Sequence, residues 1–154
     1  MAVRIGENRA LDSITHQAGV IAYRVEDGQS EVLLITSRDT RRWIIPKGNI
    51  GRGKTALEAA EQEAFEEAGV TGTVASTIPL GFYMYFKRHD DDTTSPVSVE
   101  VYLLKVDRQH KKWPEKGTRK LRWLPVPEAI KKVEEPGVVP LLKRLAELIA
   151  AEVS

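Results

Sequence analysis

Residues 48–70 read GNIGRGKTALEAAEQEAFEEAGV, and no other part of the chain says as much about its architecture. Charges in and just before this stretch are segregated rather than mixed. From Arg38 to Lys54 there are six bases and one acid, whereas from Glu58 to Glu67 there are five acids and no base. Such segregation is unusual for a surface that is merely solvated, so the sequence predicts a basic loop directly before an acidic helix.

The helix is expected to span residues 56–68. Thr55 followed by Glu58 fits a capping box, in which the Thr55 hydroxyl accepts the Glu58 N–H and the Glu58 carboxylate accepts the Thr55 N–H. A glycine at position 69, followed by a β-branched residue, supplies the stop. The apolar residues at helical spacing form a stripe, which consists of Leu57, Ala60, Ala64 and Ala68.

Three carboxylates gather beside that stripe. Glu63, Glu66 and Glu67 fall within an arc of about 100° on a helix that advances roughly 100° per residue. Like charges at these spacings repel by roughly a few tenths of a kcal/mol per pair, which a hard divalent cation such as Mg²⁺, Mn²⁺ or Ca²⁺ would offset. The pattern alone favours a metal site and a plain solvated helix face about equally.

The glycine-rich basic loop, expected over residues 47–54, suits phosphate. Backbone N–H groups and cations beside a metal can contact phosphate oxygens, so loop and helix together indicate metal-assisted phosphoryl chemistry. Among these bases, Arg42, Lys47 and Lys54 are the candidate substrate contacts. Ordinary surface charge explains about half of the bases in this segment.

The remaining pattern predicts an α+β domain in which helices pack on a mixed or antiparallel sheet. Alternation along residues 97–106 directs Glu100 away from the core. The polar segments 89–96 and 107–118 are expected to be loops that shape a pocket. We expect strands at 17–24, 31–36, 43–45, 73–77, 80–87, 97–106 and 120–124, and helices at 127–134 and 138–151.

Composition limits the classes of protein to consider. The chain has 154 residues, 42% hydrophobic and 29% charged, which suits a single domain over residues 1–154. It has no cysteine for disulfides or thiolate metal sites, and a formal net charge of +1 provides no general field for gripping DNA. No apolar run suits a membrane helix, and residues 1–17 lack a signal-like apolar core, so a cytoplasmic location is expected.

The stretch 48–70 resembles the box of the Nudix hydrolase family, which runs Gly, a Glu six residues later, then Arg-Glu-apolar-x-Glu-Glu-x-Gly-apolar. Gly48 matches the first glycine. The end of the box is matched at the family spacing by Glu63, Ala64, Glu66, Glu67, Gly69 and Val70. Two positions depart from it, because Lys54 stands in place of the first glutamate and Gln62 in place of the arginine.

Beyond the box, the resemblance narrows to the diphosphoinositol-polyphosphate and diadenosine-polyphosphate phosphohydrolase branch. It implies an α/β/α sandwich whose partner is a phosphorylated small-molecule substrate, either a dinucleoside polyphosphate or an inositol pyrophosphate, with no DNA and no membrane. The stretches that carry it are AGVIAYR (18–24), EVLLITSRDTRRWIIPKG (31–48), VYLLKVDRQHKKWPE (101–115) and RKLRWLPVPEAIKKV (119–133).

The resemblance also implies a mechanism, in which water attacks a diphosphate linkage with Mg²⁺, or Mn²⁺, held by the helix carboxylates. The implied ligands are Glu63, Glu66 and Glu67, and a backbone carbonyl near Gly48 would complete the metal site. A metal neutralises phosphate charge and lowers the pKa of bound water, whose proton Glu66 or Glu67 would accept as the general base.

The sequence gives less support for the roles of residues outside the box. Glu100 is a possible extra acid, base or ligand, because several relatives recruit a carboxylate from outside the box. Lys87 and Arg88 would contact distal phosphates, although a solubilising edge explains them equally well. Gln62 can donate a hydrogen bond to a carboxylate but lacks the charge that makes such a bond roughly twice as strong. With Lys54 also changed, we expect reduced or retuned activity, unless Lys54 itself reaches substrate phosphate.

Two other functions stay open. A catalytically weakened domain could bind a phosphorylated ligand as a sensor, a hypothesis motivated by Lys54 and Gln62. The same site could also remove pyrophosphate from a triphosphorylated RNA 5′ end, although the chain has no long basic stripe. The apolar face of the last helix packs most simply on the sheet and also permits a homodimer, so monomer and homodimer are both compatible with the sequence.

Overall fold

Strand β1 (Thr15–Glu26) lies at the centre of the sheet in the computed structural model, which describes residues 13–153. It pairs in parallel with β7 (Thr94–Gln109) and antiparallel with β2 (Gln29–Thr36) and β4 (Lys47–Asn49). Residues 17–22 of β1 are all buried, because both faces of this strand are covered. A continuous apolar run is the pattern expected of such a strand.

The outer strands extend the sheet on both sides of β1. Strands β3 (Trp43–Ile44) and β8 (Leu121–Pro125) pair with β2, while β5 (Val70–Val74) and β6 (Gly81–Arg88) pair with β7. All of these pairs are antiparallel, so the β1–β7 pair makes the sheet mixed. This confirms the expected mixed sheet.

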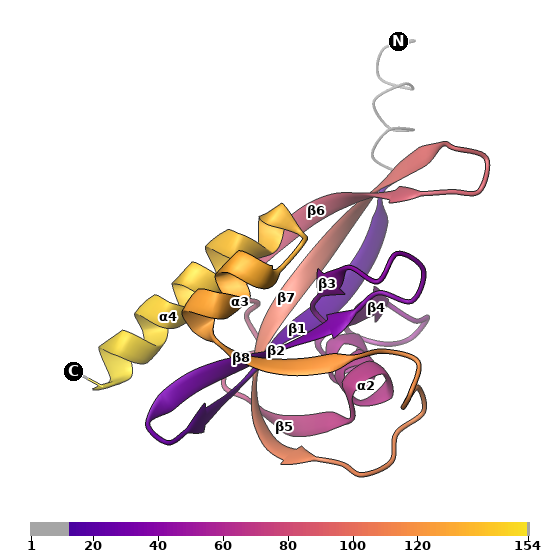
Figure 1. Ribbon diagram of the computed structural model, residues 1–154. Helices are drawn as coiled ribbons and strands as arrows, with labels where there is room; N and C mark the ends of the chain where they lie inside the picture. The colour runs from indigo at the N-terminus through magenta and orange to yellow at the C-terminus, as the bar shows by residue number, and fades with distance from the viewer. Residues whose placement is uncertain (1–12, 154) are drawn as a thin grey trace.

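Helices cover both faces of the sheet (Figure 1). Helix α2 (Ala56–Ala68) packs on one face, and α3 (Val126–Lys132) and α4 (Val139–Val153) pack on the other, with a 3₁₀ turn at Pro136–Val138 between them. The three layers confirm the predicted α+β sandwich. Within the described residues, none of the helices is long and apolar enough to cross a membrane.

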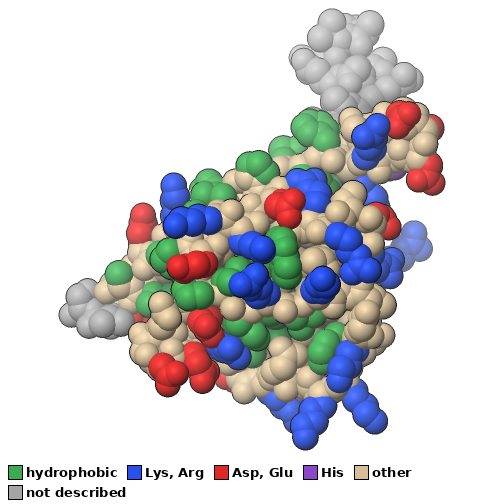
Figure 2. Space-filling view, in the orientation of Figure 1, with side chains coloured by type: hydrophobic (Ala, Val, Ile, Leu, Met, Phe, Trp, Pro, Cys, Tyr) green, Lys and Arg blue, Asp and Glu red, His purple; other side chains and the backbone are tan. Residues whose placement is uncertain are grey.

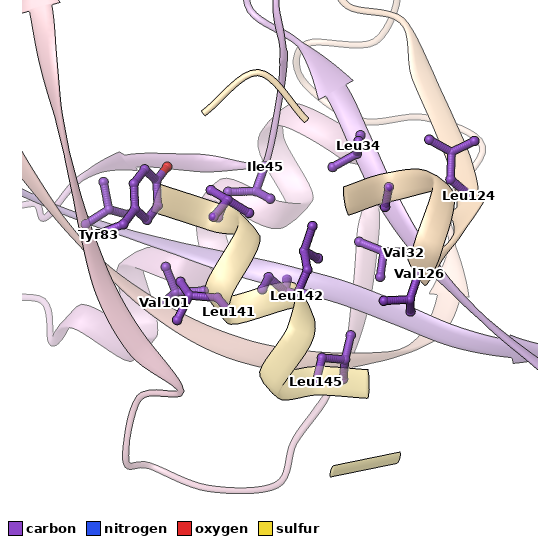
Figure 3. Close-up of a cluster of buried hydrophobic side chains, with 14 of the residues drawn as sticks. Val32, Leu34, Ile45, Tyr83, Val101, Leu124, Val126, Leu141, Leu142 and Leu145 are labelled. Atoms are coloured by element: carbon purple, nitrogen blue, oxygen red, sulfur yellow. The ribbon is translucent and has the colours of Figure 1, made fainter. Parts of the chain in front are cut away.

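Each face of the sheet has its own core. Under α4, Leu141, Leu142 and Leu145 pack with apolar side chains of β2, β6 and β7 (Figure 3). Burial of each such side chain stabilises the fold by about 1.5–3 kcal/mol. Under α2, the fully buried side chains of the helix are alanines, among them Ala60 and Ala64, and Leu57 packs partly buried beside them. Their small side chains allow α2 to lie close to β1 and β4.

The ends of α2 follow the sequence prediction. Thr55 Oγ1 accepts the Glu58 N–H and Glu58 Oε1 accepts the Thr55 N–H, both at 3.1 Å, which completes the capping box. At the other end Gly69 has a φ of 70°, and its N–H donates to helix carbonyls. A left-handed residue that closes a helix in this way favours glycine.

Several predicted boundaries were wrong. The loop expected over residues 47–54 begins with β4, because Gly48 pairs with Ala18 of β1. Strand β7 runs from Thr94 to Gln109 instead of 97–106, since its polar ends pair with β6 and β5. Strand β5 occupies 70–74 rather than 73–77. Strand ends made of polar residues show no alternation of hydrophobic and polar side chains. The sequence pattern therefore did not indicate these parts of the strands.

Candidate active site

Helix α2 and strand β4 together position the acidic residues. Glu63 and Glu67 lie one turn apart on the side of α2 that approaches β4. Glu67 is almost enclosed, with a side chain only 7% exposed, and its Oε1 accepts the Lys47 N–H at 3.2 Å. The backbone of β4 is therefore hydrogen-bonded directly to a carboxylate of the helix.

Glu63 packs against the bare backbone of Gly48. A Cβ atom added at position 48 would lie 2.3 Å from Glu63 Cδ and 2.5 and 2.6 Å from its carboxylate oxygens. Real Cβ contacts are essentially never shorter than 3.0 Å, so only glycine leaves room for this carboxylate. The first glycine of the box thus determines how closely Glu63 can approach the strand.

The Glu63 and Glu67 carboxyl groups lie close enough to interact directly, so the protonation of one affects the other. The pKa of Glu67 is raised to about 8, mainly by burial, while Arg119 opposes the rise and Glu63 adds to it. Burial also raises the pKa of Glu63, with support from the charges of Glu66 and Glu115. The pair therefore keeps a proton to a higher pH than an ordinary glutamate does.

Glu66 has a side-chain partner of its own. Its Oε1 accepts a hydrogen bond from Gln62 Nε2 at 2.6 Å, so the residue that replaces the box arginine contacts the second carboxylate. This i, i+4 side-chain contact occupies one oxygen of Glu66, and the joint role of the three carboxylates at a metal stays a prediction. Across residues 13–153, no three acidic or histidine side chains are already arranged to hold a metal ion together.

Arg119, which sequence reasoning missed, is the cation that reaches the pair. Its Nη2 lies 3.6 Å from Glu67 Oε2 and 3.3 Å from Glu115 Oε1, and its Nη1 donates to the Thr36 carbonyl at 3.1 Å. The Arg119 side chain is 9% exposed. It belongs to the stretch 119–133 that carries the family resemblance. No spacing between this arginine and other residues indicates that it contacts α2, because it is one base among several in a basic segment.

A cleft of about 340 Å³ lies on the opposite side of β4, and Arg42, Lys47 and Glu135 are among its lining residues. Adjacent residues of a strand point to opposite faces, so Lys47 enters the cleft while Gly48 faces α2. Lys47 Nζ lies 3.3 Å from Glu135 Oε1, and Arg42 donates to the Glu134 carbonyl. The backbone N–H of Lys47 thus contacts the Glu67 carboxylate, while the side chain of the same residue lies in the cleft.

Three predicted substrate contacts lie elsewhere. Lys54 is exposed and its charge acts on Glu58 at the start of α2. Lys87 and Arg88 are exposed at the tip of the β6–β7 hairpin, which projects away from α2 (Figure 1), and Arg88 pairs with Asp92 at 2.9 Å. The structure does not bring these three bases to the carboxylates, so their roles stay predictions.

Glu100 lies on the same face of the sheet as Gly48. In the strand register Ala18 pairs with both residues, so two strand spacings, about 10 Å, separate their backbones. Glu100 is partly buried and accepts a hydrogen bond from the Tyr102 hydroxyl. Alternation predicted that this face of β7 would point away from the core, but Tyr102 is buried because α2 covers that face.

The raised pKa of Glu67 predicts an unusual pH dependence of stability. Because the pKa of Glu67 is about 8 in the folded protein and 4.5 for an ordinary glutamate, the folded state binds more protons than the unfolded state between these values. Stability of the metal-free protein should therefore fall as pH rises across this window. Thermal unfolding in the presence of a chelator at about pH 5, 6.5 and 8 measures this.

The Glu67→Gln variant provides the control for that experiment. It removes the titrating group while its amide oxygen can still accept the Lys47 N–H, so its melting temperature should depend less on pH over the same range. A wild-type melting temperature that rises with pH through this window, or a variant with an identical slope, would show that the pair does not retain a proton in this range.

Comparisons with known proteins bear on this site. The family model described as the NUDIX domain matches residues 15–145. The chain is 36% identical to Nudix hydrolase 12, mitochondrial, of Arabidopsis thaliana, over 65% of the chain and 50% of that relative, so it spans about half the relative's length. It is 29% identical to diphosphoinositol polyphosphate phosphohydrolase 3-alpha of Homo sapiens, over 75% of the chain and 66% of that protein.

Solved structures support the same fold. The crystal structure of the C. elegans Ap4A hydrolase aligns with a TM-score of 0.69 at 24% identity, covering 88% of this chain and 98% of that one. At this identity the likeness concerns the fold alone. The name of the plant relative includes a mitochondrial location. The cytoplasmic location expected for this protein therefore stays a prediction.

Proposed function

Because the chain belongs to the Nudix family, we propose that it is a metal-dependent hydrolase that cleaves a diphosphate linkage in a polyphosphorylated small molecule. The observation that carries this proposal is the carboxyl pair of the half-buried Glu63, which packs against Gly48, and the buried Glu67. A buried pair with raised pKa values is costly for a merely structural role, and such pairs cluster at functional sites.

The donor set fits a hard divalent cation. Two carboxyl groups that retain a proton offer anionic oxygens once the proton leaves, and carboxylate oxygens are the ligands that Mg²⁺ and Mn²⁺ prefer. Glu63 and Glu67 would hold the cation, and Glu66 would join them by rotating away from Gln62. The mixture of protein carboxylates and substrate phosphates is typical of Mg²⁺ sites.

A bound cation would neutralise phosphate charge and lower the pKa of a water molecule. The protein contributes the rest of the chemistry. Glu67 is held at one oxygen by the Lys47 N–H and faces Arg119 with the other, so its orientation is fixed. Glu66 is the more accessible carboxylate, and we assign it the proton of the attacking water.

Because the cleft and the carboxylates lie on opposite sides of β4, the cleft is the proposed site for substrate phosphates remote from the scissile linkage. Lys47 and Arg42 would provide positive charge for phosphate groups. Further Lys and Arg side chains gather on the face seen in Figure 2, over α3 and β3. A small molecule with several phosphates suits this local basic surface, and a dinucleoside polyphosphate and an inositol pyrophosphate both have that chemistry.

The test is phosphate release, after a coupling phosphatase where needed, from diadenosine polyphosphates, inositol pyrophosphates, nucleoside triphosphates and triphosphorylated RNA, each with Mg²⁺ or Mn²⁺. We expect turnover of a diadenosine polyphosphate or an inositol pyrophosphate that stops when a chelator removes the metal. Turnover that persists in chelator would contradict the proposal, and turnover confined to RNA would favour the 5′-end function instead.

A sensor is the second candidate, and Gln62 is the observation that favours it. The box arginine is absent, and Gln62 contacts Glu66 without contributing a charge. A protein of this kind would bind a phosphorylated ligand, seen as a raised melting temperature, and release no phosphate from any of the four substrate classes.

A further inference from the structure

The acidic helix has lost the cation that the Nudix box would supply. Gln62 stands at the arginine position, and its amide donates to Glu66 rather than to Glu63 or Glu67. Among the described residues, the three helix carboxylates make one ion pair with a base, that between Glu67 and Arg119. Arg119 is therefore the source of positive charge for the carboxyl pair, and it comes from outside the box.

Arg119 is fixed in place on three sides. Its guanidinium faces Glu67 Oε2 at 3.6 Å, contacts Glu115 Oε1 at 3.3 Å through both Nε and Nη2, and donates to the Thr36 carbonyl at 3.1 Å. A planar guanidinium presents five donors in a rigid fork and satisfies three partners in this way, whereas an ammonium group has three donors at one point of a flexible stem. With 9% of the side chain exposed, solvent screens these contacts little.

The segment that carries Arg119 is attached to the end of α2. The Glu115 N–H donates to the Glu66 carbonyl at 3.0 Å, and the His110 N–H donates to the Gly69 carbonyl at 2.8 Å. Trp113 packs where a side chain at Gly69 would lie. These contacts hold the guanidinium at a constant position relative to the carboxylates of the helix.

We propose that Arg119 is a positioning residue that replaces the missing box arginine, by holding the Glu67 carboxylate in the orientation in which it binds the metal. This inference rests on the proposed function. It explains how the box can tolerate Gln62, because Arg119, which is distant in sequence but adjacent to Glu67 in the fold, supplies the positive charge. Outer contacts that orient a metal ligand typically change metal affinity or activity by about 10- to 100-fold.

The test compares Arg119→Met and Arg119→Lys with the wild type and with Arg122→Met, which removes a charge from an exposed position nearby in sequence. Mn²⁺ affinity is measured by calorimetry, and kcat and KM are measured on the best substrate. Arg119→Met should weaken Mn²⁺ binding and lower kcat by about 10- to 100-fold each, with little change in KM. Arg119→Lys should recover part of both, and Arg122→Met should behave as wild type.

Other outcomes overturn the inference. If Arg119→Met raises KM and leaves Mn²⁺ affinity unchanged, Arg119 contacts the substrate instead. If the variant melts at a lower temperature but its folded form binds Mn²⁺ as the wild type does, the contact is only structural. Wild-type protein that binds no Mn²⁺ would overturn the proposed function as well, whereas equal binding by wild type and Arg119→Met overturns this inference alone.

Discussion

Replacing Glu67 with glutamine should lower kcat for diphosphate hydrolysis by about 100-fold or more, because loss of a metal ligand removes several kcal/mol of charge stabilisation in the transition state. Glutamine preserves the size of the side chain and an oxygen that can accept the Lys47 N–H. The fold should therefore survive the change. Steady-state kinetics at saturating Mg²⁺ measure the effect.

Glu61→Gln is the matched control for that variant. Glu61 is an exposed glutamate of the same helix, two residues before Glu63, and thus on a different face. It should keep wild-type kcat, although it carries the same chemical change. Equal losses in Glu61→Gln and Glu67→Gln, or wild-type kcat in Glu67→Gln, would remove Glu67 from the catalytic site.

A methyl group at position 48 should lower kcat strongly without unfolding the protein. In Gly48→Ala the new Cβ would lie 2.3 Å from Glu63 Cδ, so the Glu63 carboxylate must move away from β4. Because the displaced atoms are at the end of a flexible side chain, the cost in stability is small. The displaced ligand should lower kcat by about 10- to 100-fold, by analogy with other losses of ligand orientation.

Gly51→Ala tests whether that effect is specific. A Cβ at position 51 would meet only Lys54 Cδ, at an ordinary 3.6 Å, so its kcat and melting temperature should match the wild type. Both variants are assayed for kcat and for thermal unfolding. If Gly48→Ala turns over substrate as fast as Gly51→Ala, the close approach of Glu63 to β4 is irrelevant to activity.

The sequence predicts the helix better than it predicts the site. Thr55, Glu58 and Gly69 act through local rules of capping, so both ends of α2 could be placed from the chain alone. The register of Glu63 and Glu67 on one face follows from helical geometry in the same way. The length of β7 could not be predicted, since its polar ends pair with other strands and show no local pattern.

Contacts between segments that are distant in the chain could not be predicted from the sequence for a related reason. Arg119 reaches Glu67 only because the segment 110–118 folds back over the end of α2. Nothing in the spacing of bases along the chain indicates such a path. The i, i+4 spacing allows Gln62 to contact Glu66, but the sequence does not show that Gln62 donates to Glu66 and not to Glu63.

The most direct test of the carboxyl pair as a metal site is a calorimetric titration with Mn²⁺ at about pH 7, in two buffers of different ionisation enthalpy. The wild type should bind Mn²⁺ and release protons, because the cation displaces the proton that the raised pKa values of Glu63 and Glu67 retain at this pH. The double variant Glu63→Gln with Glu67→Gln should lose both signals, and Glu61→Gln should keep them. Unchanged Mn²⁺ affinity in the double variant would contradict the account.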